Sequence, residues 1–178
     1  YFKNNNEANK LVIWLAHTEE LCQQAYDEFS NAWSNIGNRK ILSFKLFKNF
    51  RYDITKIKSG FAVISLDYAY SLTKKKQGDF FKLASNCKFV IMDEAHMAIA
   101  PSYKHVLDII NTKSTNLLGL TATPGRSHML KDEDVKLANF FHKQKITLKI
   151  KNYKNPIKWL QAKGYLSNVN TESLTSNI

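Results

Sequence analysis

Two adjacent carboxylates, Asp93 and Glu94, directly follow the apolar residues 89–92, and His96 stands two positions further along the chain. The apolar run has the length of a strand, so both acids lie where a buried strand should end. Residues that leave a strand in succession point in different directions, and the two carboxylates can therefore do different work. One can hold Mg²⁺, which prefers hard oxygen ligands, while the other orients a water for attack on a phosphoryl group. Seen alone, such a pair is common after a strand, and it could be an acidic cap in which Asp93 starts a helix at Ala95.

A second set of polar side chains follows the apolar residues 116–120, where the run TATPGR begins. Thr121 and Thr123 are short hydroxyl side chains at a predicted strand end, able to exchange hydrogen bonds with His96. Arg126 closes the run and is a candidate for contact with a phosphate or with another domain. There are simpler alternatives for these residues. The threonines could be ordinary turn residues before a proline, and the histidine could be an imidazole on the surface of a helix.

A third candidate site lies at Ala16, His17 and Thr18, between an apolar run and a helical pattern. Backbone N–H groups at the start of a helix can hold a phosphate of a nucleic-acid strand. Glu19 and Glu20 speak against a strong anion site in that first turn, because their charges would repel a phosphate. A plain helix that Thr18 caps is the alternative.

The elements that would position these residues alternate between short apolar strands and amphipathic helices. Such alternation is typical of βαβ units, so we predict an α/β domain with a mostly parallel sheet flanked by helices. Parallel sheets bind ligands at the carboxyl ends of their strands, which is where all three candidate sites fall. The predicted strands are residues 11–16, 41–47, 61–65, 89–92, 116–120 and 146–150, and the predicted helices run from Thr18 to near Gly37 and over residues 80–84, 102–110 and 156–162.

The chain of 178 residues carries a formal net charge of +11, from 26 Lys and Arg against 15 Asp and Glu. An excess of this size favours a polyanionic partner, most often nucleic acid. The alternative is that the lysines merely solvate the surface. The lysines at residues 74–76, in a predicted surface loop or helix end, fit both interpretations.

The two cysteines, Cys22 and Cys87, form neither a CxxC pair nor a cluster with metal-ligand spacing. Both adjoin apolar runs, which indicates reduced core residues of a cytoplasmic protein. No apolar run is long enough to span a membrane, and the polar residues 1–10 are unlike a signal peptide. Since the sequence starts at Tyr1 rather than at a methionine, we expect the chain to be part of a longer protein.

Three segments resemble motifs of superfamily 2 helicases and translocases. VIMDEAH, residues 90–96, resembles the Walker B or DEAH-box motif, and LLGLTATPGR, residues 117–126, resembles the third motif. VIWLAHTEELCQQA, residues 12–25, resembles motif Ia, and the order of the three motifs along the chain agrees with the family. NPIKWLQAKGYL, residues 155–166, resembles the linker region that follows the first motor domain. The AH and TATPGR variants favour the restriction-enzyme-like and repair-helicase branch.

The resemblance implies the first RecA-like motor domain of an enzyme that uses ATP and Mg²⁺. Asp93 would bind Mg²⁺ and Glu94 would polarise the attacking water. His96 would connect the nucleotide to Thr121 and Thr123, which would couple hydrolysis to movement. The motif Ia region would contact a nucleic-acid strand, with DNA favoured over RNA. The implied protein partners are a second motor domain of the same chain and a restriction or repair complex.

The sequence departs from the family pattern in two places. No GxxxxGK[ST] loop, whose backbone and lysine hold the phosphates of ATP, occurs in the 178 residues. That loop precedes motif Ia in the family, so we expect it upstream of Tyr1 and expect this chain alone to lack ATPase activity. The family also has a threonine after its third strand that contacts nucleic acid, and here Ser65, Asp67 or Tyr68 could take its place. Tyr68 and Tyr70 could stack on bases or belong to the core.

These features predict a partial RecA-like domain at residues 1–150 and the start of a linker toward a second motor domain at residues 151–178. The predicted function is a fragment of an ATP-dependent nucleic-acid helicase or translocase. The main alternative is a non-catalytic RecA-like platform that binds nucleic acid or protein. An unrelated P-loop NTPase is a third hypothesis, which the TATPGR run disfavours.

Overall fold

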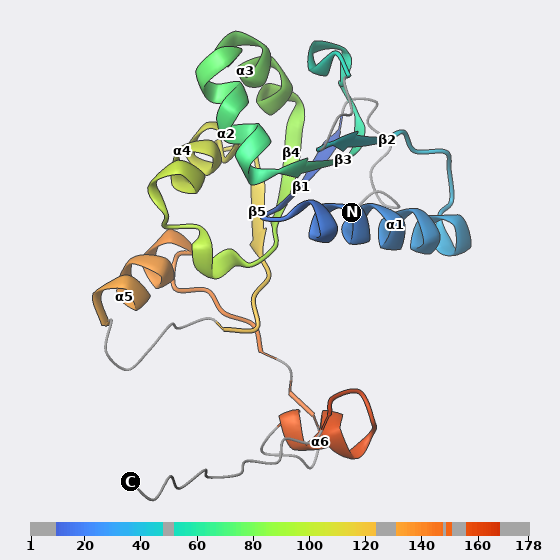
Figure 1. Ribbon diagram of the computed structural model, residues 1–178, viewed down its shortest axis with the longest axis vertical. Coiled ribbons are helices and arrows are strands. Elements are labelled where there is room, and N and C mark those ends of the chain that lie inside the picture. The colour runs from blue at the N-terminus through green and yellow to red at the C-terminus, as the bar shows by residue number, and fades with distance from the viewer. Residues whose placement is uncertain (1–9, 48–51, 124–130, 148, 151–155, 168–178) are drawn as a thin grey trace, which may run out of the picture. The chain divides into compact units, whose positions relative to one another are not determined.

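The computed structural model describes residues 10–47, 52–123, 131–147, 149–150 and 156–167. Within these residues five strands form one sheet in the order β2-β3-β1-β4-β5, and every neighbouring pair is parallel (Figure 1). The predicted α/β architecture is therefore confirmed. The strands are β1 (Leu11–Ala16), β2 (Ser43–Leu46), β3 (Gly60–Ser65), β4 (Cys87–Met92) and β5 (Asn116–Gly119).

The chain divides into two compact units, residues 1–143 and residues 144–178. The sheet and most helices belong to the first unit, and α6 belongs to the second. The helices are α1 (Glu19–Ile36), α2 (Leu66–Lys75), α3 (Gln77–Asn86), α4 (Pro101–Ile110), α5 (Lys131–Phe140) and α6 (Pro156–Ala162), and two short 3₁₀ turns are η2 (Ile54–Lys56) and η3 (Ala95–Met97).

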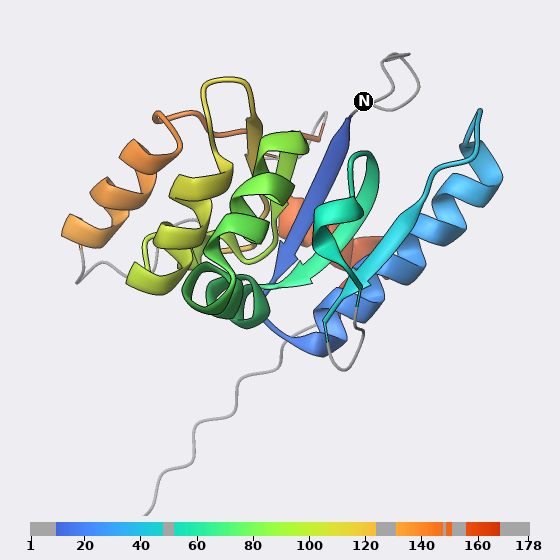
Figure 2. The ribbon, with the colours of Figure 1, turned by 90° about the horizontal axis from the view of Figure 1, so that it is seen from above.

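The side chains of the central strand β1 alternate between two apolar cores. Leu11, Ile13 and Leu15 pack into the larger core with α2, α3 and α4, whereas Val12 and Ala16 pack into the smaller core with α1. Figure 2 shows α1 on one side of the sheet and α2, α3 and α4 on the other. A parallel sheet covered in this way presents its strand ends, rather than its faces, to a ligand.

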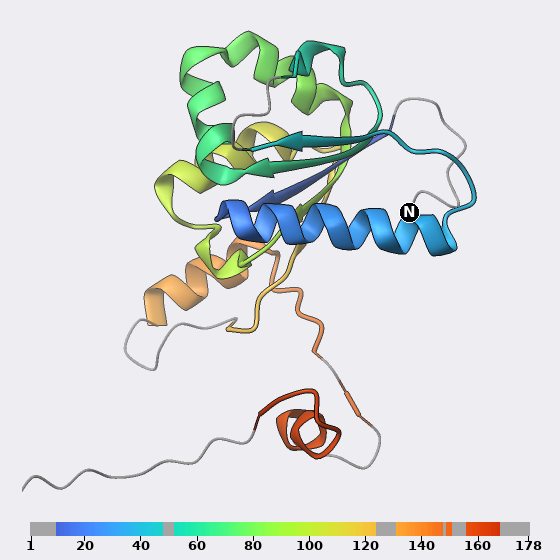
Figure 3. The ribbon, with the colours of Figure 1, turned by 45° about the vertical axis from the view of Figure 1, so that its right-hand side comes forward.

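Helix α1 begins and ends where the sequence predicts. Thr18 is its N-cap, with Oγ1 accepting a hydrogen bond from the Leu21 N–H at 3.2 Å, and Gly37 follows its last residue. The helix lies along the sheet (Figure 3), where the ring of Phe29 stacks on that of Phe61 with centroids 3.7 Å apart. This packing fixes the position of the β1–α1 junction relative to the rest of the sheet edge.

Gly60 starts β3 with a backbone conformation that other residues rarely adopt. Its φ is +119°, and a Cβ placed there would lie 2.3 Å from the carbonyl oxygen of Leu42. That carbonyl accepts a hydrogen bond from the Phe61 N–H at 2.9 Å, so the close approach belongs to the pairing of β3 with the chain leading into β2. Only glycine combines this φ with this contact.

Several predicted boundaries differ from the observed ones. The second strand is shorter than residues 41–47, α3 is longer than residues 80–84, and α2 and α5 were not predicted. Helix α2 is hard to predict from the sequence, because its buried positions include threonine and alanine as well as leucine. Its pattern of apolar residues at helical spacing is therefore weak.

The predicted strand at residues 146–150 was wrong for the part of that segment that the structure describes. Only Ile150 makes an isolated bridge there, and Ile146 is 97% exposed. Alternating apolar residues form a stable strand only when a neighbouring strand is available for pairing.

Candidate functional site

The two carboxylates leave β4 at the carboxyl edge of the sheet, and backbone hydrogen bonds hold them from both sides. The Asp93 N–H donates to the Leu15 carbonyl of β1 at 2.9 Å. The Ala95 N–H donates to the Leu120 carbonyl, just after β5, at 2.8 Å. The acid pair is therefore fixed between the ends of two neighbouring strands, as a rigid reaction site requires.

Glu94 has a left-handed backbone conformation, with φ 51° and ψ 49°. Such a conformation costs a residue with a Cβ about 1–2 kcal/mol and is found preferentially at functional sites. The Asp93 carboxylate accepts a hydrogen bond from the Glu94 N–H at 2.9 Å. The acidic-cap alternative fails, because the cap position of η3 is Glu94 and no side chain there bonds to the turn.

His96 joins the carboxylates to the threonines after β5. Its Nδ1 lies 3.1 Å from Glu94 Oε2 and 3.2 Å from Thr121 Oγ1. Thr123 Oγ1 is 3.5 Å from the same nitrogen, and the Thr123 N–H donates to Thr121 Oγ1 at 3.1 Å. Only 18% of the His96 side chain is exposed, so the alternative of a surface imidazole is excluded. His96 Nδ1 carries at most one hydrogen, so the Glu94 carboxylate and the threonine hydroxyls compete for the single hydrogen bond that this nitrogen can donate.

The donor set at this edge fits Mg²⁺ bound together with a phosphate ligand. Mg²⁺ in such sites takes one or two protein carboxylates and completes its shell with phosphate oxygens and water. Asp93 is partly exposed at the strand end and can supply such a carboxylate, with the partly exposed carboxylate of Glu94 beside it. Among the described residues there is no group of three or more acidic, histidine or cysteine side chains that would enclose a metal without a substrate.

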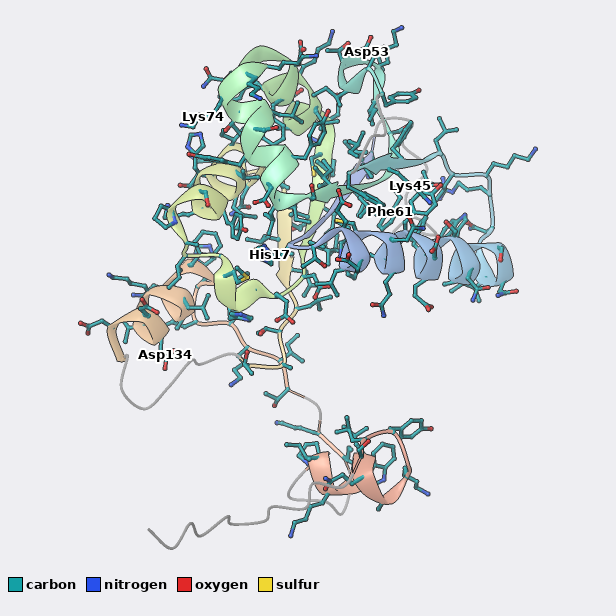
Figure 4. The ribbon with its side chains drawn as sticks, in the orientation of Figure 1. His17, Lys45, Asp53, Phe61, Lys74 and Asp134 are labelled. Carbon is teal, nitrogen blue, oxygen red and sulfur yellow. The ribbon has the colours of Figure 1, made fainter. Side chains whose placement is uncertain are left out.

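The third candidate site lies at the same edge, where β1 passes into α1. Ala16 is fully buried, and its carbonyl faces the Cys22 thiol with the sulfur at 3.9 Å. The Thr18 hydroxyl is occupied as the N-cap of α1. His17, labelled in Figure 4, is only partly buried, so of these three side chains the imidazole is the group best placed to meet a ligand.

A contact that the sequence did not predict holds His17. The Tyr103 hydroxyl of α4 is 2.7 Å from His17 Nδ1 and 3.4 Å from Asp67 Oδ1 in the first turn of α2. Burial, helped by the charge of Asp67, raises the pKa of the Tyr103 hydroxyl above its usual range. The sequence does not single out Tyr103, because its spacing from Val106 and Leu107 is that of an ordinary core residue of α4.

The remaining candidates have distinct places. Ser65 caps α2, with its Oγ 3.4 Å from the Tyr68 nitrogen, and Tyr68 and Tyr70 pack partly buried against the larger core. Lys74 and the two lysines after it are exposed at the end of α2. The predicted site residue Arg126 lies outside the described residues.

Residues 1–126, more than half of the chain, match the family described as type III restriction enzyme, res subunit. The chain belongs to this family. The matched range of this Res-family chain contains the acid pair, both threonines and the β1–α1 junction. No curated protein matches the sequence.

Among the solved structures that resemble the Res-family chain in fold are two helicases. The Pyrococcus furiosus Hef helicase domain has a TM-score of 0.58 and 16% identity, covering 92% of this chain and 32% of its own. The DUF1998 helicase MrfA, solved bound to DNA and AMPPNP, has a TM-score of 0.50 and 15% identity, covering 74% and 20%. The chain therefore spans about a third of the Hef chain and a fifth of the MrfA chain. At these identities the likeness shows a shared α/β fold.

The part of the Res-family chain that the structure describes contains no helix with the length and apolar character needed to cross a bilayer.

The buried thiols allow a first test of the site's framework. Burial raises the pKa of both Cys22 and Cys87 to about 12. We therefore expect almost no reaction with 5,5′-dithiobis(2-nitrobenzoate) at about pH 8 in the folded protein and full reaction of both thiols in urea. Rapid reaction of either thiol in the folded protein would contradict the burial of that cysteine.

The same raised pKa values predict how stability depends on pH. Because the folded state holds the thiol protons more tightly, the contribution of these thiols to the free energy of unfolding should be fully present below pH 9, the ordinary thiol value, and should be lost as the pH rises toward 12.

Proposed function

We propose that the protein is part of an ATP-driven nucleic-acid helicase or translocase of the DEAH-box type, with DNA the favoured strand. The observation that carries the proposal is the contact of His96 Nδ1 with both Glu94 and Thr121. It joins the ends of β4 and β5 in one polar cluster at the edge where parallel sheets bind ligands. A scaffold without catalysis would gain nothing from a partly exposed acid held in a left-handed backbone.

Each residue of the cluster has a proposed role. Asp93 holds Mg²⁺, which when bound with ATP offsets the charge that develops on the transferred phosphoryl group. Glu94 accepts a proton from the attacking water and orients it. His96 exchanges its Nδ1 hydrogen bond between Glu94 and the hydroxyl of Thr121, with Thr123 beside it. Hydrolysis at β4 thus changes the contacts of the segment after β5.

The nucleic-acid strand is proposed to contact the β1–α1 junction through the His17 imidazole and the backbone N–H groups at the start of α1. The formal charge of +11 supports a polyanionic partner, and the exposed lysines at the end of α2 add sequence-independent attraction. MrfA, which shares the fold, was solved with DNA. Arg126 is a further proposed contact to phosphate or to a second motor domain, toward which residues 151–178 would lead.

The phosphate-binding loop is proposed to come from chain upstream of Tyr1. Among the described residues β5 pairs only with β4, and Leu118 and Leu120 stay 40% and 37% exposed. An open strand edge beside uncovered apolar side chains supports an additional strand and helix at this place.

The test compares phosphate release by the 178-residue chain with that of a longer natural protein that contains a GxxxxGK[ST] loop ahead of Tyr1. We expect no ATPase above background for the shorter chain and DNA-stimulated ATPase for the longer one, because the acids alone do not cradle the phosphates. A longer protein that has no such loop and no ATPase, yet binds nucleic acid, would replace this proposal by the non-catalytic platform.

A further inference from the structure

Three side chains from different parts of the chain meet beside the β1–α1 junction. His17 follows β1, Asp67 stands in the first turn of α2 after β3, and Tyr103 stands in α4. Strands β1 and β3 are neighbours, with Ala16 opposite Ser65, so His17 and Asp67 leave the same edge close together. Tyr103, only 7% exposed, reaches both from the helix that follows η3.

The hydrogen bonds of this group fix the direction in which the imidazole of His17 points. A tyrosine hydroxyl has one hydrogen, so Tyr103 donates either to His17 Nδ1, at 2.7 Å, or to Asp67 Oδ1, at 3.4 Å. In the second case Nδ1 carries a hydrogen and donates it to the tyrosine oxygen. In both cases Nδ1 faces Tyr103, so Nε2 lies on the opposite side of the ring. The edge-on packing of the two rings, with centroids 5.8 Å apart, agrees with one preferred orientation.

We propose that Tyr103, with Asp67 behind it, is a positioning residue that holds His17 so that Nε2 meets a phosphate of the bound nucleic-acid strand. This inference rests on the function proposed above. An imidazole that is already oriented loses less freedom on binding than a mobile one, and the strand is bound more tightly as a result. Because three residues separate α4 from η3, the same hydroxyl also connects the strand-binding junction to the segment that carries His96.

The decisive variant is Tyr103→Phe, which removes the hydroxyl and keeps the ring that fills the larger core. Tyr26→Phe is a matched control, because it also removes a hydrogen-bonded tyrosine hydroxyl, 3.1 Å from Ser43 Oγ, and keeps a ring that packs against the smaller core. Affinity is measured by fluorescence anisotropy of the 178-residue chain with a labelled single-stranded oligodeoxythymidine at fixed salt.

We expect Tyr103→Phe to weaken binding about 3- to 10-fold and Tyr26→Phe to leave it unchanged. His17→Ala should weaken binding at least as much. In the His17→Ala background, Tyr103→Phe should cause no further loss, because the tyrosine acts only through the histidine. Equal losses in both backgrounds, or an unchanged affinity for Tyr103→Phe, would overturn the inference while leaving the proposed function intact. Failure of the unaltered chain to bind the oligonucleotide would overturn both.

A spectroscopic measurement separates positioning from a general structural effect. The ¹⁵N signals of the His17 ring, identified by their loss in His17→Ala, report whether Nδ1 is hydrogen-bonded. We expect Tyr103→Phe to shift the His17 Nδ1 signal and to leave those of the other histidines in place. An unshifted His17 signal in this variant would show that the hydroxyl does not hold the ring.

Discussion

In the longer, loop-containing protein proposed above, replacing Glu94 by glutamine is expected to lower the proposed DNA-stimulated ATPase rate by about 10²- to 10⁴-fold. Glutamine has the same length and keeps a side-chain oxygen that can accept the hydrogen bond from His96 Nδ1, now 3.1 Å from the carboxylate. It lacks the negative charge that draws a proton from water. The loss should therefore appear in the maximal rate, measured as phosphate release at saturating ATP and DNA, and not in DNA affinity.

Asp108→Asn provides a matched control for removing one carboxylate charge. Asp108 is exposed near the end of α4, and its carboxylate pairs with Lys104 one turn earlier in the helix. Exposed pairs of this kind contribute little, so we expect an unchanged ATPase and an unchanged unfolding midpoint. If Glu94→Gln retained more than about a third of the normal rate under these conditions, Glu94 would not be the group that activates water.

The sequence predicted the position of the acid cluster well because the features that form it are local. An apolar run that ends in charged residues marks a strand end, and parallel strands bring their carboxyl ends to one edge. The structure accordingly places Glu94, His96 and Thr121 in contact. Their roles in catalysis and coupling stay predictions that the variants above and below test.

The contacts of Tyr103 could not be predicted in the same way. His17 and Tyr103 are 86 residues apart, and they meet only because β3, β1 and β4 are adjacent in that order. Apolar spacing predicts which face of a helix is buried, but it contains no information on which strand ends lie opposite that face. The same limit explains why Asp67 was considered only as a substitute for a missing threonine.

Gly119 is a second feature that only the structure reveals, and its replacement by alanine is the other large effect that we expect. A Cβ at Gly119 would lie 2.7 Å from the Ala95 Cβ and 2.6 Å from Cζ of Phe141. The phenyl ring can shift, whereas the Ala95 Cβ is attached to the backbone of η3 and moves only with that turn. We therefore expect Gly119→Ala to lower the free energy of unfolding by about 1–3 kcal/mol, as overpacking does. Urea denaturation of the 178-residue chain measures it.

The same clash should also reduce activity, because η3 carries His96 and follows directly after Glu94. A displacement of a few tenths of an ångström at the contacts of His96 Nδ1 is expected to lower the proposed ATPase of the longer, loop-containing protein about 10-fold. Gly78→Ala is the control for adding a methyl group, since nothing lies within 4 Å of that position in α3 and alanine there should be neutral or slightly stabilising.

A second-site change distinguishes this mechanism from a general loss of strand stability. Ala95→Gly removes the Cβ that opposes the new methyl group, so in combination with Gly119→Ala it should restore most of the ATPase and part of the stability. Because the two Cβ atoms would be in direct contact, the effects of the single changes should not add. Additive losses in the double variant would mean that the close approach of η3 to β5 does not position His96, and the proposed connection between hydrolysis and the segment after β5 would lose its structural basis.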